Sequence, residues 1–108
     1  MRNEGLIKEF YNCAAACNIC ADACLDENDV KKMVPCIRLD KVCAATCIAT
    51  AQSLAVDLPK EELKGLVKYC KEICQKCADE CSRHEAQHCK DCARACKECV
   101  EACEKFLT

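Results

Sequence analysis

The sequence predicts an all-α fold, an antiparallel up-down-up-down four-helix bundle with a cysteine-lined core. Glycine and proline occur only twice each in 108 residues, and Ala, Glu, Lys and Leu are abundant, a composition that favours helices. Sixteen cysteines fall in runs whose members are three, four or seven residues apart, the spacing of one helix face. Three short polar or proline-containing stretches divide the chain into four segments, each of a length typical of a bundle helix.

The first two helices are expected over residues 4–25 and 30–55. The polar stretch DEND at 26–29 separates them, and Asp29 is placed to cap the N-terminus of the second helix. Pro35 is expected in the first turn of that helix, because a proline deeper in a helix removes a backbone hydrogen bond.

The last two helices are expected over residues 59–82 and 85–106. The linker stretch VDLPKEEL at 56–63 places Pro59 at a first helical position, and two glutamates follow it where the helix dipole favours negative charge. The polar stretch SRHEAQH at 82–88 lies between the third and fourth helices. Because every connection is short, consecutive helices are expected to be antiparallel neighbours, and residues 1–108 to form a single domain.

The cysteine runs give each helix one inward face, on which Cys replaces the usual Leu or Ile. The sixteen residues are Cys13, Cys17, Cys20, Cys24, Cys36, Cys43, Cys47, Cys70, Cys74, Cys77, Cys81, Cys89, Cys92, Cys96, Cys99 and Cys103. In the second run, Asp40 occupies the position of the missing cysteine. A lone buried carboxylate is costly, so we expect Asp40 to pair with Lys41 or Arg38 or to hydrogen-bond a thiol, in preference to binding metal directly.

The two ends of the predicted bundle carry different residues on these inward faces. At one end, which we call the sealed end, mostly apolar residues continue the faces: Leu6, Phe10, Thr50, Leu54, Leu63, Val67 and Phe106. The opposite end, which we call the mouth, brings together soft or borderline metal ligands: Cys24, Cys36, Cys81, Cys89, Met33, His84 and His88. An ion would therefore be taken up at the mouth.

Composition excludes several classes of function. The net charge of −2 gives no basic field for nucleic acid or an anionic membrane. The N-terminal stretch MRNEGLIKEFYN lacks the apolar run of a secretory signal, and no stretch approaches the ~18 to 20 apolar residues of a membrane span. We therefore expect a cytoplasmic protein with reduced thiols. Nothing in the chain resembles an acid–base pair or an activated nucleophile, so no enzymatic activity is expected.

So many thiols can serve several purposes. A core of cysteines acting only as small hydrophobic residues would fill too little volume between large helices. Disulfides cannot close between residues four apart on one helix, because their Cβ atoms lie ~5 to 6 Å apart where a disulfide needs ~3.8 Å. Iron–sulfur motifs need loops that wrap a cluster, and the ferredoxin run C-x2-C-x2-C-x3-C is absent. An oxidant-scavenging thiol module is a further alternative. Thiolate-bound metal ions fit the spacing best.

Zinc and copper(I) are the two metals to compare. Zinc requires a tetrahedron, for which two four-cysteine layers are expected: Cys17/Cys43/Cys74/Cys96 and Cys13/Cys47/Cys70/Cys99. Each such site would carry a charge of about −2 inside a medium of low dielectric constant. Copper(I) accepts two or three shared thiolates, so a filled core is nearly neutral, and seven C-x3-C pairs are placed to bridge ions. Copper(I), several ions per chain, is the favoured ligand; a zinc or iron–sulfur protein with a regulatory or electron-transfer role is the alternative.

Four segments resemble those of the bacterial copper storage proteins, which are cysteine-lined four-helix bundles: CAAACNICADAC (13–24), CIRLDKVCAATC (36–47), CKEICQKCADEC (70–81) and HCKDCARACKEC (88–99). The resemblance covers essentially the whole chain, and the absence of a signal peptide is similar to the cytosolic branch. It implies that all sixteen cysteines bind Cu(I), with His84 and His88 as further ligands and Met33 as a weaker match. It also implies a tetramer that stores copper and limits its toxicity. A copper chaperone or a small thiol is the expected copper donor.

Overall fold

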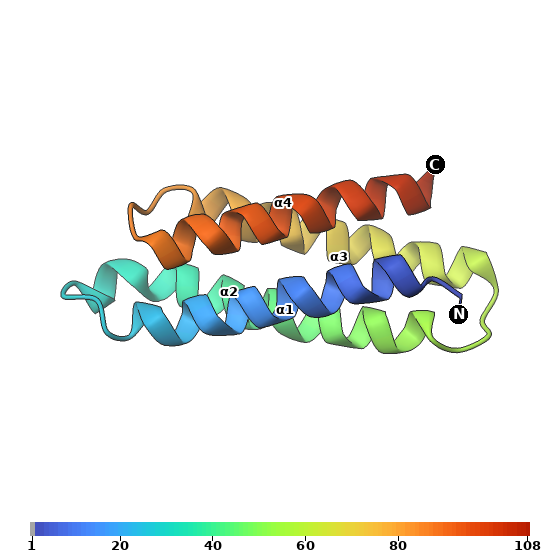
Figure 1. Ribbon diagram of the computed structural model, residues 1–108, viewed down its shortest axis with the longest axis horizontal. Helices are drawn as coiled ribbons and strands as arrows, with labels where there is room; N and C mark the ends of the chain where they lie inside the picture. Colours follow the sequence, from blue (N-terminus) through green and yellow to red (C-terminus); the bar gives the residue numbers. More distant parts are fainter. Residues whose placement is uncertain (1) are drawn as a thin grey trace.

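Four helices make up nearly all of the computed structural model, which describes residues 2–108 (Figure 1). They are α1 (Glu4–Cys24), α2 (Val30–Leu54), α3 (Lys60–Cys81) and α4 (Gln87–Leu107). No strand occurs among residues 2–108. Each helix begins and ends within two residues of its predicted bounds, so the predicted all-α class and four-helix bundle are confirmed.

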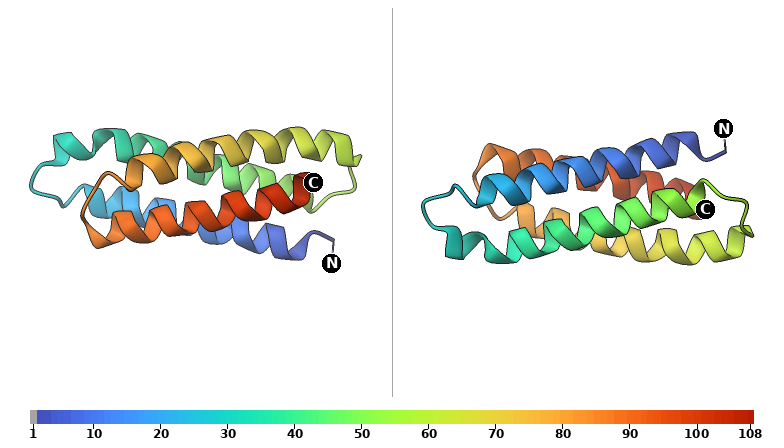
Figure 2. Two further views of the ribbon diagram at one scale, coloured as in Figure 1. Left: turned by 90° about the horizontal axis from the view of Figure 1, so that it is seen from above. Right: turned by 90° about the horizontal axis from the view of Figure 1, so that it is seen from below.

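The helices form a square bundle in which each is antiparallel to the next along the chain (Figures 1 and 2). Each helix packs against two others, in the pairs α1–α2, α2–α3, α3–α4 and α1–α4. The bundle measures 47 × 20 × 18 Å. The α1–α2 and α3–α4 connections lie at the mouth, whereas the α2–α3 connection and both chain ends lie at the sealed end.

Local sequence signals mark the starts of α2 and α3. The side chain of Asp29 accepts a hydrogen bond from the backbone N–H of Lys32 (3.3 Å), as predicted for a helix cap. Pro59 lies immediately before α3 rather than at its first helical position, and Glu61 and Glu62 occupy the first turn.

Pro35 lies inside α2, one turn further along than predicted. Asp29 sets the helix start at Val30, so the proline falls in the second turn. Its ring removes only the hydrogen bond to the carbonyl of Lys31, an exposed residue whose carbonyl can bind water instead. The proline is therefore tolerated near a helix end that its cap has already fixed.

The core consists almost entirely of cysteine and alanine, except at the sealed end. There Phe10, Leu54 and Val67 are the largest fully buried apolar side chains of the chain. The amide of Asn3 also donates a hydrogen bond to the carbonyl of Leu54 (3.2 Å), which joins the start of α1 to the end of α2. This end is closed by apolar packing, as the sequence predicted.

Among residues 2–108, no helix is both long enough and apolar enough to cross a bilayer.

Candidate metal centre

All sixteen cysteine side chains are completely buried, and all sixteen are free thiols. The predicted three-, four- and seven-residue spacing turns every one of them inward. Neighbouring sulfurs lie 3.5 to 4.0 Å apart, well beyond the ~2.05 Å of a disulfide bond. Among residues 2–108, all of these sulfur–sulfur contacts except Cys20–Cys24 join different helices. The bundle therefore encloses a column of reduced thiols contributed by all four helices.

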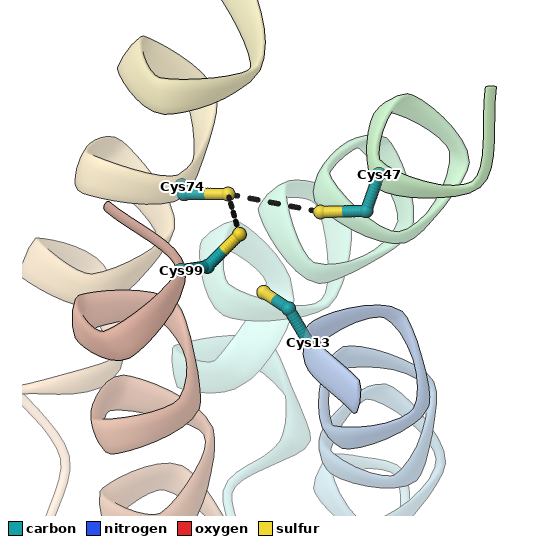
Figure 3. Close-up of side chains that lie close together, drawn as sticks. All are labelled: Cys13, Cys47, Cys74 and Cys99. Carbon is teal, nitrogen blue, oxygen red and sulfur yellow. Dashed lines mark hydrogen bonds between the residues drawn. The ribbon is translucent and has the colours of Figure 1, made fainter. Parts of the chain in front are cut away.

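The thiols near the middle and the sealed end form what we call the inner group. It contains Cys13, Cys17, Cys43, Cys47, Cys70, Cys74, Cys77, Cys92, Cys96 and Cys99. Figure 3 shows one quartet, in which each helix contributes a single thiol: Cys13, Cys47, Cys74 and Cys99. The sulfur of Cys74 lies 3.7 Å from that of Cys47 and 3.6 Å from that of Cys99. The four sulfurs of such a quartet are close enough to bind one metal ion together, or to bind several ions that share the same sulfurs.

One predicted layer is matched except on α3: the quartet of Figure 3 contains the predicted Cys13, Cys47 and Cys99, with Cys74 in place of Cys70. Cys74 contacts both Cys43 and Cys47, at 3.7 Å each, whereas Cys70 contacts only Cys47. At this level the α3 thiols are thus staggered by about half a cysteine spacing relative to those of α2, so that Cys74 lies between Cys43 and Cys47. Consecutive sites share thiols as a result: Cys13 belongs both to the quartet of Figure 3 and to a second one, with Cys17, Cys43 and Cys96.

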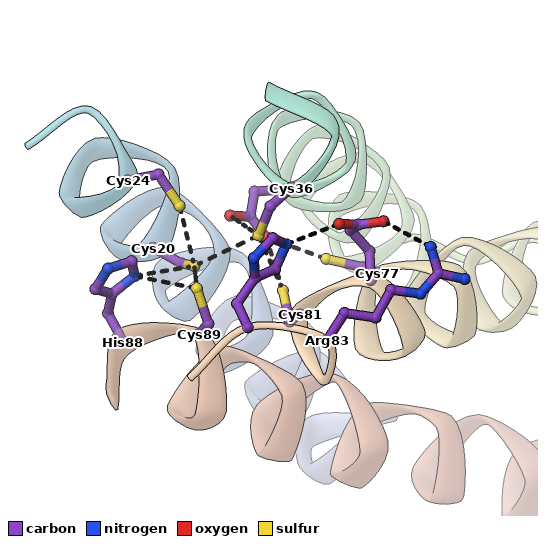
Figure 4. Close-up of polar contacts among 11 residues, drawn as sticks. Cys20, Cys24, Cys36, Cys77, Cys81, Arg83, His88 and Cys89 are labelled. Carbon is purple, nitrogen blue, oxygen red and sulfur yellow. Dashed lines mark hydrogen bonds and ion pairs between the residues drawn. The ribbon is translucent and has the colours of Figure 1, made fainter. Parts of the chain in front are cut away.

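The thiols at the mouth form a separate set, the mouth group: Cys20, Cys24, Cys36, Cys81 and Cys89 (Figure 4). The sulfur of Cys20 is its centre, 3.9 Å from Cys24, 4.0 Å from Cys36 and 3.9 Å from Cys89. Cys81 lies 3.5 Å from Cys36. The quartet formed by Cys20, Cys24, Cys36 and Cys89 is therefore the first set of four thiols met at this end.

Asp40 links the two groups. Its buried carboxyl accepts hydrogen bonds from two thiols of the mouth group, Cys36 (3.7 Å) and Cys81 (3.5 Å). It also accepts hydrogen bonds from two thiols of the inner group, Cys77 (3.2 Å) and Cys92 (3.3 Å). Among residues 2–108, no sulfur–sulfur contact of 4.0 Å or less joins the two groups, so the carboxyl is the bridge between them.

The predicted ion pair of Asp40 does not form. Lys41 instead donates a hydrogen bond to Asn18 on the outside of the bundle (2.8 Å), and the exposed Arg38 makes no contact with Asp40. The alternative prediction, hydrogen bonding to thiols, is confirmed. Burial raises the pKa of Asp40 from 3.8 to about 10, so its carboxyl holds a proton at neutral pH.

The two histidines lie at the mouth, as predicted, but they face different partners. The Nδ1 atom of His88 lies 3.5 Å from the sulfurs of both Cys20 and Cys89 (Figure 4). Its Nε2 lies 3.2 Å from Glu27. His84 is buried, and its Nε2 lies 2.8 Å from Glu80. His88 is thus in contact with the mouth group, whereas the one hydrogen-bond partner of the His84 ring within residues 2–108 is the Glu80 carboxylate.

Met33 is also buried at the mouth. Together with Glu27 and His84 it lines a cavity of about 250 Å³ that opens to the outside. Cys103 is the remaining predicted ligand; it lies one turn beyond Cys99 toward the sealed end and forms no sulfur contact of 4.0 Å or less within residues 2–108.

Burial changes the acidity of the outermost thiols. It raises the pKa of Cys89 to about 11 and also raises that of Cys24. These thiols are therefore protonated at neutral pH in the absence of metal. A metal ion that binds them must displace their protons.

Glu27 and Glu80 were not identified from the sequence. Glu80 stands four residues before His84, the spacing at which side chains meet on a helix, and this signal was available. Glu27 lies in the α1–α2 connection, far along the chain from His88, and only the packing of the mouth brings the two together.

Comparison with known proteins gives consistent results. The family profile described as "Csp: Copper storage protein" matches residues 1–108. The cysteine-rich protein YhjQ of Bacillus subtilis (strain 168), described as uncharacterized, is 37% identical over 90 residues, which cover 83% of this chain and 82% of that protein.

Two solved structures are similar to the whole bundle. One is a cytosolic copper storage protein from Streptomyces lividans loaded with five coppers, with a TM-score of 0.92, 40% identity and coverage of 94% of this chain and 88% of that chain. The other is the Cu(I)-bound copper storage protein BsCsp3, with a TM-score of 0.91, 34% identity and complete coverage of both chains (100% each).

Proposed function

The chain belongs to the copper storage protein family, and we propose from this that it stores many Cu(I) ions on the thiolates of its core. The observation that carries the proposal is the column of sixteen buried thiols, all of which except Cys103 have a sulfur neighbour 3.5 to 4.0 Å away. An ion bound between such sulfurs needs only small side-chain movements. Because neighbouring sites share thiols, one ion can be held per thiolate or nearly so.

Charge favours Cu(I) over Zn²⁺ as the stored ion. Each Zn²⁺ in four thiolates leaves about −2 charges in a buried site, and the overlapping quartets of the inner group would bring such charges within a few ångströms of one another. Shared thiolates with Cu(I) approach electrical neutrality. The quartets are nevertheless large enough for tetrahedral zinc, so zinc binding is the second candidate. Iron–sulfur binding has less support, because the thiols project from continuous helices rather than from loops.

The ligands we propose are all sixteen cysteines, joined at the mouth by His84, His88 and Met33. His88 already contacts two thiols, whereas His84 and Met33 line the mouth cavity. Ions would be received at this end, pass to the mouth group, and then move beyond Asp40 into the inner group. The protonated carboxyl of Asp40 would serve as a hydrogen-bonding partner of thiols rather than as a ligand, since hard oxygen suits Cu(I) poorly.

The biological setting that we propose follows the family resemblance and the relatives. The Streptomyces protein is described as cytosolic, and we propose the same location for this chain, where stored copper is kept from causing damage. We also propose that residues 1–108 act as one binding domain without enzymatic activity, and that four copies assemble. The copper donor would be a chaperone or a small thiol compound.

An anaerobic competition titration tests this proposal. The fully reduced protein is titrated with Cu(I) against a coloured chelator and, separately, with Zn²⁺. We expect the protein to withdraw Cu(I) until about one ion is bound per cysteine, of which there are sixteen. Saturation at one or two copper ions, or retention of copper by the chelator while zinc binds at about one ion per four thiols, would contradict the storage of Cu(I).

A further inference from the structure

The mouth holds two histidine–carboxylate pairs of the same design. His84 is 7% and Glu80 11% exposed, and their Nε2···Oε2 distance is 2.8 Å. His88 is 18% and Glu27 40% exposed, with a distance of 3.2 Å. In each pair the carboxylate contacts the Nε2 atom of the ring and not the Nδ1 atom. Neither glutamate touches a thiol, so neither belongs to the proposed ligand set.

The His88 pair determines which ring nitrogen carries the proton. An ionised carboxylate only accepts hydrogen bonds, so Nε2 of His88 must be the nitrogen that donates. In a neutral imidazole the other nitrogen then has a free lone pair. That nitrogen is Nδ1, which lies 3.5 Å from the sulfurs of Cys20 and Cys89.

We propose that Glu27 is a positioning residue for copper uptake: it holds the ring of His88 by Nε2, so that an unprotonated Nδ1 faces Cys20 and Cys89 where the first Cu(I) arrives. This inference rests on the proposed storage of Cu(I). Metal-binding histidines are commonly oriented by a carboxylate on their other nitrogen, and loss of such a partner typically costs about 10- to 100-fold in metal affinity or activity. Glu27 also lines the mouth cavity, so its carboxylate is adjacent to the path of an incoming cation.

Asp26 provides a matched control. It precedes Glu27 in the same connection, has the same charge, is exposed, and forms no side-chain hydrogen bond or ion pair within residues 2–108. Glu27→Gln and Asp26→Asn remove the same charge from the mouth. Glu27→Lys and Asp26→Lys reverse it, and of these two only Glu27→Lys places a hydrogen-bond donor next to Nε2 of His88. The first pair separates hydrogen bonding from net charge, and the second pair tests the choice of tautomer.

Two measurements on the full-length reduced protein are needed. The first is the rate and affinity for the first equivalent of Cu(I) delivered from a chelator, with total capacity measured alongside. The second is the ¹⁵N spectrum of the histidine rings at about pH 8, where an ordinary imidazole is neutral. We expect Glu27→Lys to lower first-ion loading about 10- to 100-fold more than Asp26→Lys does, and to move the proton of His88 from Nε2 to Nδ1. Glu27→Gln should have an intermediate effect, because an amide can either accept or donate.

The proposal is overturned if the Glu27 variants lose no more first-ion loading than the Asp26 variants, or if they lose it while the ring nitrogens of His88 keep their signals. All four substitutions lie in a connection between helices, and thermal melting checks that each variant is folded. Failure of the storage function would look different, because the unmodified protein would then bind few or no Cu(I) ions. Unchanged capacity with unchanged loading in Glu27→Lys would refute the role of Glu27 alone.

Discussion

Replacing Phe10 with alanine tests how the bundle stays folded before copper arrives. The core thiols are small, and Phe10 is the largest of the fully buried side chains, packed at the sealed end near Leu54 and Val67. Truncating a fully buried phenylalanine costs about 3 to 5 kcal/mol. The whole free energy of unfolding of a domain of this size is about 5 to 15 kcal/mol. We therefore expect Phe10→Ala to remove a large fraction of the stability of the copper-free protein.

The expected change in melting temperature follows from the chain length. An unfolding entropy of about 2.1 cal/mol/K per residue, applied to 108 residues, converts a loss of about 4 kcal/mol into a decrease of about 15 to 20 °C. Circular dichroism of the reduced, copper-free protein measures this in heat and in urea. Ile19→Ala is the control, because Ile19 lies on the same helix but is 66% exposed, and it should change stability by less than about 0.5 kcal/mol.

Copper should mask the defect. Ions that bind only the folded state stabilise it by mass action, so the loaded Phe10→Ala protein should melt close to the loaded parent protein and hold the same number of ions. A loss below about 1 kcal/mol in the copper-free protein, or an equal loss in Ile19→Ala, would refute the view that the sealed end supplies the apolar packing. A reduced copper capacity would show that this end takes part in binding.

Three further predictions concern the thiols and the mouth. The pKa of Asp40 is raised from 3.8 to about 10 in the folded state. Between these two pH values the folded chain therefore holds a proton on Asp40 that the unfolded chain has released. The stability of the copper-free protein should then fall as pH rises through this window, by up to about 1.4 kcal/mol per pH unit; Asp40→Asn should lack this slope, and identical slopes in urea denaturation would contradict the assignment. The pKa of Cys89 is raised to about 11 and that of Cys24 is also raised. At any pH below these pKa values, Cu(I) must displace the protons of both thiols in order to bind. Affinity at the mouth should weaken about tenfold per pH unit of acidification for each proton released, and a pH-independent chelator competition would refute this. Met33→Leu keeps the packing, so stability should change by less than about 1.5 kcal/mol, while first-ion loading should slow; loading at the parental rate would make Met33 a packing residue only.

Much of the fold could be predicted from the sequence because a single residue type marks the inward faces. The three- and four-residue spacing of the cysteines identifies the buried side of every helix, and the cap residue Asp29 fixes where α2 starts. The apolar residues that follow the thiols, such as Phe10 and Leu54, identified the sealed end. The same spacing placed His84 and His88 at the mouth, since a position on an antiparallel helix fixes the end at which it lies.

Features that depend on the relative position of two helices could not be predicted. The half-spacing stagger of α3 against α2, which places Cys74 between Cys43 and Cys47, is set by side-chain packing and not by the period of either helix. The link that Asp40 makes between the two thiol groups depends on this stagger. The contact of Glu27 with His88 depends on the path of a connection between helices, which no periodic pattern specifies.

X-ray absorption at the copper edge, on the anaerobically loaded protein, tests the central claim most directly. If Cu(I) is stored on the thiol column, each copper should have two or three sulfur neighbours, and copper–copper scattering should appear because adjacent sites share thiolates. If most copper neighbours were nitrogen or oxygen and no copper–copper scattering appeared, the ions would lie on the histidines of the mouth and on carboxylates, which would contradict storage in the core.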